Sequence, residues 1–585
     1  CKYEDIPRLQ ETVDGRIMMG AYCLKDSWLV IKLVTKLCKL SNVVEMARVT
    51  GISMRDVLER GQMIRSLCSI YQYAKTHDPE YFLPEVITKT RRVQTRRNVL
   101  IDTDHGVQLK VEIDEATTAI TKYKGAVVFP PTPGFYRDPV TCLDFASLYP
   151  SIIRYRNLCY STLVNWDTIR KLNLKEDVDY HRISYVDIDD KGELKVCQTE
   201  KDACFLTHAQ RPGILPQILA SLLTARKRAK KDMRNAKDSN AYNVCNGRQL
   251  ALKLVCNSMY GFTGTWYGFL PCRAIAEAVT STGRRLALET KSIVEKNYPD
   301  CQCIYGDTDS VFVKIPKARF KSKTILETVK GVALLSAAIA ELCDRSYHLN
   351  ENGYIVLEFE KVLWPLVLLK KKRYYSYKYE DGKFEQPVVD YKGIECKRRD
   401  GSKITKTWQK KILHMVLVDQ DLSKVNEFIS KGLRDIYMNN VPLEEFIMSQ
   451  KLSRHPSQYK VAGAHVKLAI KQMKNSASNI RVGDRIPYCI RAGYKGEKIS
   501  DRAVAPCDIR SGKYVLDIAY YVEKSIRKPI TSMLKDVLNV DSLFIVKARK
   551  QQSSTAFKRL FHISSESAQK KRRTDMGESL DAFFS

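Results

Sequence analysis

Apolar side chains recur at three- and four-residue spacing in several long stretches of the chain, which is the period of an amphipathic helix. Residues 41–75 follow this pattern, with an interruption at 60–62. Two more helices are predicted over 216–236 and 246–260, joined by a polar bend. The stretch 400–550 is mixed and rich in helical patterns.

Strand patterns fall between these helices. Residues 127–136, VVFPPTPGFY, predict a strand followed by a Pro/Gly turn. Residues 138–160 begin as a strand, PVTCLDF, and continue as a helix. Residues 302–313 read as an apolar run, an acidic turn and a second apolar run, which predicts a hairpin. Residues 90–125 are polar and predict a linker or a small subdomain, and the polar, basic residues 561–585 predict a flexible tail.

Length and composition are those of a multidomain globular protein. The chain has 585 residues, 44% hydrophobic and 28% charged, so we expect several domains. No apolar run approaches the ~20 residues that span a bilayer, and we expect no membrane association. Position 1 is Cys and no signal-peptide pattern follows it, which we interpret as a fragment or processed form whose true start lies upstream.

The charge is strongly positive. Lys and Arg total 97 against 66 Asp and Glu, a formal net charge of +31. A solvated surface with surplus Lys is one explanation, but an excess of this size favours a polyanionic partner, most often nucleic acid. The positive charge recurs in separate clusters, as a long binding groove would require: 226–234, 370–373, 397–399 and 570–573.

The 17 cysteines include no CxxC pair, and the nearest two are Cys301 and Cys303. This spacing supports neither a zinc module, nor an iron–sulfur cluster, nor a disulfide framework. We expect mostly free thiols in a reducing compartment.

Three acidic residues lie where predicted strands end. Asp144 closes PVTCLD, and Asp307 and Asp309 occupy the turn of the predicted hairpin. Carboxylates from two distant segments are suitable ligands for a pair of Mg²⁺ ions, which prefer oxygen donors and act ~4 Å apart in in-line displacements. A plain Asp-rich turn is the alternative for the hairpin taken alone.

The predicted helices supply complementary cations. Arg226 and Lys230 are four residues apart and share one helix face, as do Lys253 and Asn257, with Tyr260 about one turn further on. Two such helices facing each other would present three cations to one triphosphate. A solvated basic face is the alternative. Lys253 argues against it, because it lies inside an otherwise apolar stretch.

Three segments resemble motifs A, B and C of the family B DNA polymerases, in the right order. They are DFASLYPSII (144–153), LKLVCNSMYGFTG (252–264) and YGDTDSVFV (305–313). Other resemblances flank them: AYCLKD to the third exonuclease motif, YKGA to the element between exonuclease and polymerase, KKRY to the primer-gripping motif, and KGIECKRRD to the family's KGxExxRRD motif. Within the family, the chain is most similar to delta-type replicases and their herpesvirus-like relatives.

The resemblance implies a right-hand polymerase fold of α+β type with a palm sheet, two-helix fingers and a helical thumb, preceded by the end of an exonuclease domain. The implied boundaries run in chain order: 1–40 exonuclease remnant, 41–125 linker and N-terminal helices, 126–215 and 262–400 palm, 216–261 fingers, 401–560 thumb and 561–585 tail.

The resemblance also implies roles for individual residues in template-directed transfer of dNMP from dNTPs to a primer 3′-hydroxyl. Asp144 and Asp309 would hold two Mg²⁺ ions with the Phe145 carbonyl, and Asp307 would have a lesser catalytic role. The nucleotide would be bound by the backbone of Ser147 and Leu148 and by the side chains of Tyr149, Arg226, Lys230, Lys253, Asn257 and Tyr260. Tyr149 would exclude a ribose 2′-hydroxyl.

Primer-template DNA would contact a further set: Tyr123, Gly125, Lys371, Lys372, Arg373, Tyr374, Lys392 and Arg399. Only Tyr22 and Asp26 match the exonuclease, which is therefore expected to be incomplete. The cysteine-rich tail of delta-type replicases has no counterpart after Pro529, which favours a viral enzyme acting in the host nucleus or another intracellular replication site.

The last residues resemble a clamp-binding peptide. Leu580 precedes the aromatic pair Phe583 and Phe584, although Gly577 stands where Gln is usual. We expect either a sliding clamp, a viral processivity subunit or a chance match. The basic run 570–573 could be a nuclear localisation signal or merely solvated charge.

Two other classes of function remain. A polymerase-derived scaffold without activity would be marked by loss of an essential aspartate, but Asp144 and Asp309 are both present. A nucleic-acid-binding module without chemistry would explain the charge but not the acidic turn beside two basic helices. Tyr149 argues against synthesis of RNA.

Overall fold

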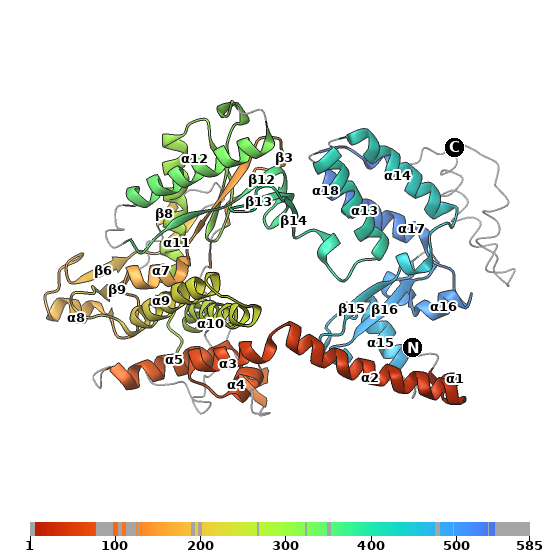
Figure 1. Ribbon diagram of the computed structural model, residues 1–585, viewed down its shortest axis with the longest axis horizontal. Helices are drawn as coiled ribbons and strands as arrows, with labels where there is room; N and C mark the ends of the chain where they lie inside the picture. The colour runs from red at the N-terminus through yellow and green to blue at the C-terminus, as the bar shows by residue number, and fades with distance from the viewer. Residues whose placement is uncertain are drawn as a thin grey trace.

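The computed structural model describes residues 6–77, 98–102, 108–112, 125–126, 128–188, 194–196, 202–265, 268–321, 324–347, 353–419, 421–473, 480–494, 496–535 and 537–544. Two bodies are visible in Figure 1, one built around the large sheet and one formed by the later helices and strands. Among the helices of this described part, none combines the length and the apolar character needed to cross a membrane.

The chain begins with helices. These are α1 (Ile6–Gln10), α2 (Val13–Lys36), α3 (Lys39–Thr50), α4 (Met54–Glu59) and α5 (Gln62–His77). The predicted helical stretch and its interruption are confirmed, since α4 ends and α5 begins around the Arg-Gly pair. The side chain of Ser53 caps α4 by accepting from the Asp56 amide. A strand hairpin follows in the predicted linker, β1 (Asn98–Asp102) and β2 (Gln108–Glu112).

A seven-stranded antiparallel sheet forms the centre of the first body. Its main path runs β10 (Gln302–Asp307), β11 (Ser310–Lys314), β4 (Val140–Phe145), β12 (Leu357–Lys370), β13 (Arg373–Glu380) and β14 (Val388–Lys392), with β3 (Gly134–Tyr136) beside β12. The predicted hairpin and the predicted strand-to-helix segment are therefore confirmed, because β4 is followed by α7 (Leu148–Tyr155).

The strand predicted at the start of 127–136 is wrong. Val128 makes only an isolated bridge to Asp307, and the regular strand β3 begins at Gly134. The prolines at 130, 131 and 133 explain the difference, because proline has no N–H to donate to a strand ladder.

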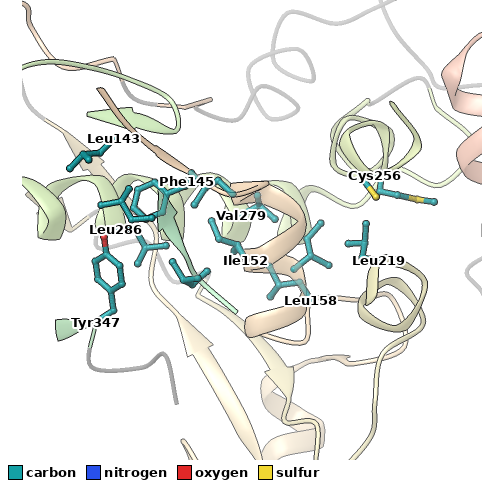
Figure 2. Packing of buried hydrophobic residues seen from close by; sticks show 14 of the residues in the cluster. Leu143, Phe145, Ile152, Leu158, Leu219, Cys256, Val279, Leu286 and Tyr347 are labelled. Atoms are coloured by element: carbon teal, nitrogen blue, oxygen red, sulfur yellow. The ribbon is translucent and has the colours of Figure 1, made fainter. Parts of the chain in front are cut away.

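Helices α11 (Arg273–Asn297) and α12 (Ile325–Ser346) pack against this sheet, whereas α9 (Ile214–Arg234) and α10 (Ser239–Gly264) pack against each other and against α7. The pair α9 and α10 confirms the two helices predicted from the sequence. Figure 2 shows Leu143 and Phe145 of β4 in one cluster with Ile152 of α7 and Leu286 of α11. Each such side chain contributes about 1.5–3 kcal/mol by leaving water, so this layer fixes the strand that carries Asp144.

Smaller elements lie at the edge of the first body. These are β5 (Leu163–Val164), β6 (Tyr180–Ile183) and β9 (Ala203–Leu206) in one sheet, the pair β7 (Val186–Ile188) and β8 (Leu194–Val196), and α8 (Trp166–Lys171).

The second body has its own hydrophobic core. Its main helices are α13 (Lys403–His414), α14 (Leu422–Tyr437), α15 (Ala464–Met473), α16 (Pro506–Arg510), α17 (Ile518–Tyr520), α18 (Lys528–Leu534) and α19 (Asp541–Phe544). The described part of this region is mixed and rich in helices, as predicted, and β15 (Met448–Lys451), β16 (Arg485–Ile490) and β17 (Ala503–Val504) form a sheet inside it. Three consecutive buried residues at the end of β16 show that this strand is part of the core.

Candidate active site

The sheet brings Asp144 and Asp309 together. Asp144 lies opposite Ser310 of β11 and opposite Glu358 of β12. The amide of Phe145 donates to the Asp309 carbonyl at 2.8 Å, and the Asp309 amide donates to the Asp307 carbonyl at 2.8 Å. Because alternate residues of a strand share a face, Asp144 is directed away from the helices that bury Leu143 and Phe145.

The hairpin turn has little freedom. Thr308 has φ +65°, in the left-handed region. A Cβ on Gly306 would lie 2.3 Å from the Phe129 ring, so only glycine allows this approach. The Phe129 amide donates to the Gly306 carbonyl at 2.9 Å, which fixes the preceding segment along β10. The turn that carries both hairpin aspartates is thus fixed by Phe129, which packs on and bonds to Gly306, and by Phe145, whose amide bonds to the Asp309 carbonyl.

A cleft of about 700 Å³, here called the main cleft, opens beside this turn. Eleven predicted residues line it: Asp144, Phe145, Ser147, Leu148, Tyr149, Arg226, Lys230, Lys253, Asn257, Tyr260 and Asp309. They come from four segments far apart in the sequence, as the predicted nucleotide site requires.

Sequence reasoning gave no role to the other residues that line the cleft, which include Arg154, Lys227, Thr308, Tyr354 and Glu358. Two had a usable signal. Lys227 belongs to the basic run that was recognised, and Glu358 interrupts the apolar side chains of a strand. Tyr354 had none, because it lies in an irregular segment before β12.

Three carboxylates line the main cleft, and two of them, Asp144 and Asp309, are partly buried and have raised pKa values. Burial, then the neighbouring Asp309 and Glu360 carboxylates, raise the pKa of Asp144 to about 7. Burial also raises the pKa of Asp309, and the Asp307 charge adds to it. In the described part of the chain, no side chain donates a hydrogen bond or forms an ion pair with either carboxylate.

This donor set fits a divalent cation. The Asp309 charge helps to raise the pKa of Asp144, and a hard cation between these two carboxylates would remove that repulsion. Within the described residues, no cluster of three or more His, Cys, Asp or Glu side chains has metal-binding geometry. Any metal here therefore needs ligands beyond side chains, which is consistent with the predicted Phe145 carbonyl.

Cations face these carboxylates across the cleft. Arg226 Nη1 donates to Ser147 Oγ at the long distance of 3.5 Å, while its Nε is buried without an acceptor among the described residues. Burial and then the Arg226 charge lower the pKa of Lys230, so these two cations repel each other without a bound anion. Lys253 is exposed between the buried side chains Leu252 and Val255. Glu358 partly offsets the charge of Lys230, and the cluster as a whole suits an anionic ligand.

Backbone groups add to this anion site. Ser147 has φ +55° and immediately precedes α7, its side chain does not cap the helix, and the first two residues of α7, Leu148 and Tyr149, line the cleft. Unpaired amides at a helix N-terminus bind anions. Tyr149, in the first turn, packs against Tyr260 of α10 with ring centroids 4.4 Å apart.

A second, smaller hollow of about 320 Å³ meets the main cleft at the turn and shares Asp144, Thr308 and Asp309 with it. We call it the Lys372 cavity. Lys372 Nζ donates to both carboxylate oxygens of Asp307, at 2.7 and 3.0 Å. Asp307 therefore has a cationic partner, unlike Asp144 and Asp309 within the part of the chain that the structure describes.

The structure distributes the predicted DNA-binding residues unevenly. Lys372 and Tyr374 line the Lys372 cavity, although Tyr374 is only 6% exposed. Arg373 pairs with Glu395 at 2.7 Å. The remaining predicted residues with described positions, which are Gly125, Lys371, Lys392 and Arg399, line neither hollow.

Four of these residues have distinct surroundings. The Gly125 carbonyl accepts from Arg284 Nη1 at 2.6 Å. Lys371 and Arg399 are exposed, and Lys392 lies 3.8 Å from Asp390. Tyr123 lies outside the described residues.

The remaining predictions lie away from both hollows. Tyr22 and Asp26 are on α2, where the Asp26 carboxylate raises the pKa of Tyr22 through a hydrogen bond. Tyr22 is 41% exposed. The predicted clamp-binding residues Leu580, Phe583 and Phe584 fall outside the described residues.

Comparison with known proteins shows the family to which the chain is similar. The model of DNA polymerase family B matches residues 52–537. The chain is 35% identical over 535 residues to the DNA polymerase delta catalytic subunit of Arabidopsis thaliana, covering 90% of this chain and 43% of that protein. It is 35% identical over 545 residues to the subunit of the same name from Schizosaccharomyces pombe, covering 92% and 44%. The chain thus spans less than half the length of these relatives.

Proposed function

Because this chain belongs to DNA polymerase family B, we propose that it is the polymerising part of a template-directed DNA polymerase, which adds dNMP from dNTPs to a primer 3′-hydroxyl. One observation carries the proposal. The main cleft brings together two partly buried carboxylates, Asp144 and Asp309, and the cations Arg226, Lys230 and Lys253, and none of these side chains forms an ion pair among the described residues. A nucleotide triphosphate with its metal ions complements both.

In this proposal the protein acts by positioning and electrostatic stabilisation. Arg226, Lys230 and Lys253 bind the triphosphate together with the amides at the start of α7. They stabilise the negative charge on its phosphate oxygens while the α-phosphate is transferred to the primer 3′-hydroxyl and pyrophosphate leaves. Asp144, Asp309 and the Phe145 carbonyl would hold two Mg²⁺ ions, which supply Lewis-acid stabilisation to the attacking and leaving oxygens.

The aromatic pair of the main cleft gives the site its shape. Tyr149 lies beneath the sugar and excludes a 2′-hydroxyl, while Asn257 and Tyr260 border the new base pair. The ring contact between Tyr149 and Tyr260 supports this arrangement, because it fixes the gate against the helix that also carries Lys253.

The right-hand layout follows from the same assignment. The large sheet is the palm, α9 and α10 are the fingers and the second body is the thumb, within the boundaries that the sequence implies. Primer-template DNA then contacts Lys371, Lys372, Arg373, Tyr374, Lys392 and Arg399, with Tyr123 and Gly125 at the entrance to the palm. Tyr22 and Asp26 belong to the proposed exonuclease remnant at residues 1–40.

The cellular setting is proposed from the relatives and the sequence. The delta-type relatives favour nuclear DNA replication. A viral origin remains a prediction from the sequence, whereas the relatives from Arabidopsis thaliana and Schizosaccharomyces pombe are cellular proteins. We also propose that residues 577–585 bind a ring-shaped processivity factor, because tethering makes rebinding to DNA intramolecular.

Deletion of that tail should shorten products without slowing insertion of a single nucleotide. The test compares a Phe583→Ala, Phe584→Ala double variant with and without the processivity factor. Loss only with the factor supports the clamp proposal, whereas equal loss in both conditions means that the aromatics dock on the enzyme itself.

The test of the main proposal is template-directed extension. The purified chain is mixed with a labelled primer-template, one dNTP at a time and Mg²⁺. We expect addition only of the nucleotide complementary to the template, and none in EDTA. Tight duplex binding without any extension would instead support the scaffold or binding-module alternatives.

A further inference from the structure

Tyr305 contributes a buried hydroxyl to the Lys372 cavity. Its side chain is 2% exposed, and its ring packs against Phe312 with centroids 5.2 Å apart. The hydroxyl accepts a hydrogen bond from the Lys372 amide at 2.8 Å and donates one to Asp307 Oδ2 at 3.4 Å. One atom thus joins the acidic hairpin to the turn between β12 and β13, which is 67 residues away in the sequence.

That turn has an unusual backbone. Lys372 has φ +60°, a conformation that side-chain-bearing residues rarely adopt. On its other side, a Cβ on Gly393 would lie 2.4 Å from the Lys372 carbonyl, so the turn is also packed closely against the chain that follows β14. The hydrogen bond from the amide to Tyr305 therefore satisfies a donor at the point where the backbone is strained.

The position of the turn decides what the Lys372 ammonium can do. An ammonium group has three N–H donors, and both carboxylate oxygens of Asp307 accept from that of Lys372. The side chain of Lys372 is 64% exposed, which leaves donor capacity toward an acceptor outside the protein. The minor-groove edge of a primer-end base pair offers such acceptors for every correct pair.

We propose that Tyr305 is a positioning residue that fixes Lys372, through the amide and through Asp307, where its ammonium tests the pairing of the primer end. The inference rests on the proposed polymerase function and adds to it a residue for which the sequence assigned no role. Tyr305 does not line the main cleft, so it acts on the primer through Lys372 rather than on the incoming nucleotide.

The test uses Tyr305→Phe, which removes only the hydroxyl. The net value of one hydrogen bond corresponds to a roughly 3- to 10-fold effect. We expect the KM for primer-template to rise by that factor and the preference for matched over mismatched primer ends to fall similarly. The apparent KM for the dNTP should stay within about twofold.

Tyr375→Phe is the matched control. Tyr375 is also fully buried, but its hydroxyl points to the other core and donates to the Met533 carbonyl at 3.5 Å. A merely structural role would give both variants the same outcome, a lower Tm with unchanged matched-to-mismatched preference. Selective loss of that preference in Tyr305→Phe supports the proposal, and equal behaviour of the two variants overturns it.

A double-mutant cycle with Lys372→Ala tests the route of action. If Tyr305 works through the ammonium, Tyr305→Phe has no further effect on primer discrimination in the Lys372→Ala background. Additive losses would overturn the proposal. Failure of the wild-type chain to extend any primer would instead refute the polymerase function itself, so the two failures are distinguishable.

Discussion

The main cleft and the Lys372 cavity meet at one hairpin turn. The carboxylates at and beside this turn differ in their pKa values and in their ion pairs. In the main cleft, Asp144 and Asp309 are partly buried and have no cationic partner among the described residues, and their pKa values are raised. In the Lys372 cavity, Asp307 accepts from Lys372 and from Tyr305. A carboxylate without a protein cation can bind a metal, whereas one already paired serves to orient its partner.

The difference originates in the strand ladder. The Asp309 carbonyl is tied to β4, so its side chain is presented beside Asp144. Asp307 ends β10, next to the turn that carries Lys372. Asp309 therefore lines both hollows, whereas Asp307 lines only the Lys372 cavity, and a DTD sequence alone does not reveal this difference.

The largest expected effect comes from exchanging single aspartates. Asp309→Asn removes one anionic ligand without adding bulk, so we expect primer extension to fall by at least about 10³-fold while duplex binding stays nearly intact. Asp307→Asn removes only the charge opposite Lys372, and we expect a loss of about 10-fold. Single-turnover extension in Mg²⁺ measures both.

The control for this pair is DNA affinity, measured by fluorescence anisotropy without dNTP. The comparison between the hollows breaks down if Asp307→Asn is as inactive as Asp309→Asn. It also breaks down if Asp309→Asn extends primers at a near-normal rate.

A second prediction concerns the shape of the main cleft. Tyr149→Ala removes the ring that packs on Tyr260, and we expect discrimination against ribonucleotides to fall by about 10²-fold, because a steric exclusion is lost. Single-nucleotide insertion with matched rNTP and dNTP measures the ratio. Tyr374→Ala, in the other hollow, should leave this ratio unchanged. An unchanged ratio in Tyr149→Ala would falsify the gate.

A third prediction separates the cations of the two hollows. Lys253→Ala should raise the apparent KM for dNTP and lower the maximal rate, by about 10- to 10²-fold in kcat/KM, because a triphosphate contact is lost. Lys372→Ala should mainly raise the KM for primer-template. Steady-state titrations of each substrate give the two profiles, and identical profiles would mean that the hollows are not functionally distinct.

Much of this arrangement was predictable from local pattern. The hairpin at 302–313 and the two helices carrying Arg226 and Lys253 have clear periods, and the motif residues of the main cleft were all brought together. The assignment of Asp307 to a separate hollow was not predictable, since it depends on a contact with a turn far along the chain.

The position of the Tyr305 side chain shows why the pattern of side chains along a strand is not sufficient to predict such contacts. A register shift between Cys303 and Tyr305 interrupts the alternation of β10, and Ile304 and Tyr305 both pack into the same cluster. A period of two would place these neighbours on opposite faces. The bulge, rather than the pattern of side chains, turns the Tyr305 hydroxyl toward Lys372.

The smallest expected effect is thermal and depends on pH. The pKa of Asp144 is raised from 3.8 to about 7, so the folded chain holds this proton more tightly than the unfolded chain does. In EDTA, this group therefore makes the protein less stable as pH rises from its unfolded pKa to about 7, with no further change above that.

Mg²⁺ binds the ionised carboxylate, and protonation should weaken the Mg²⁺ affinity by about tenfold at pH 6 relative to pH 8. We expect Mg²⁺ to raise Tm by about 2–4 °C at pH 8 and by less at pH 6, measured by differential scanning fluorimetry. Asp144→Asn should abolish this pH-dependent gain, while Asp307→Asn should retain it, because Asp307 is already paired with Lys372. An equal Mg²⁺ effect at both pH values, or the same loss in both variants, would mean that the metal does not depend on the unpaired carboxylates of the main cleft.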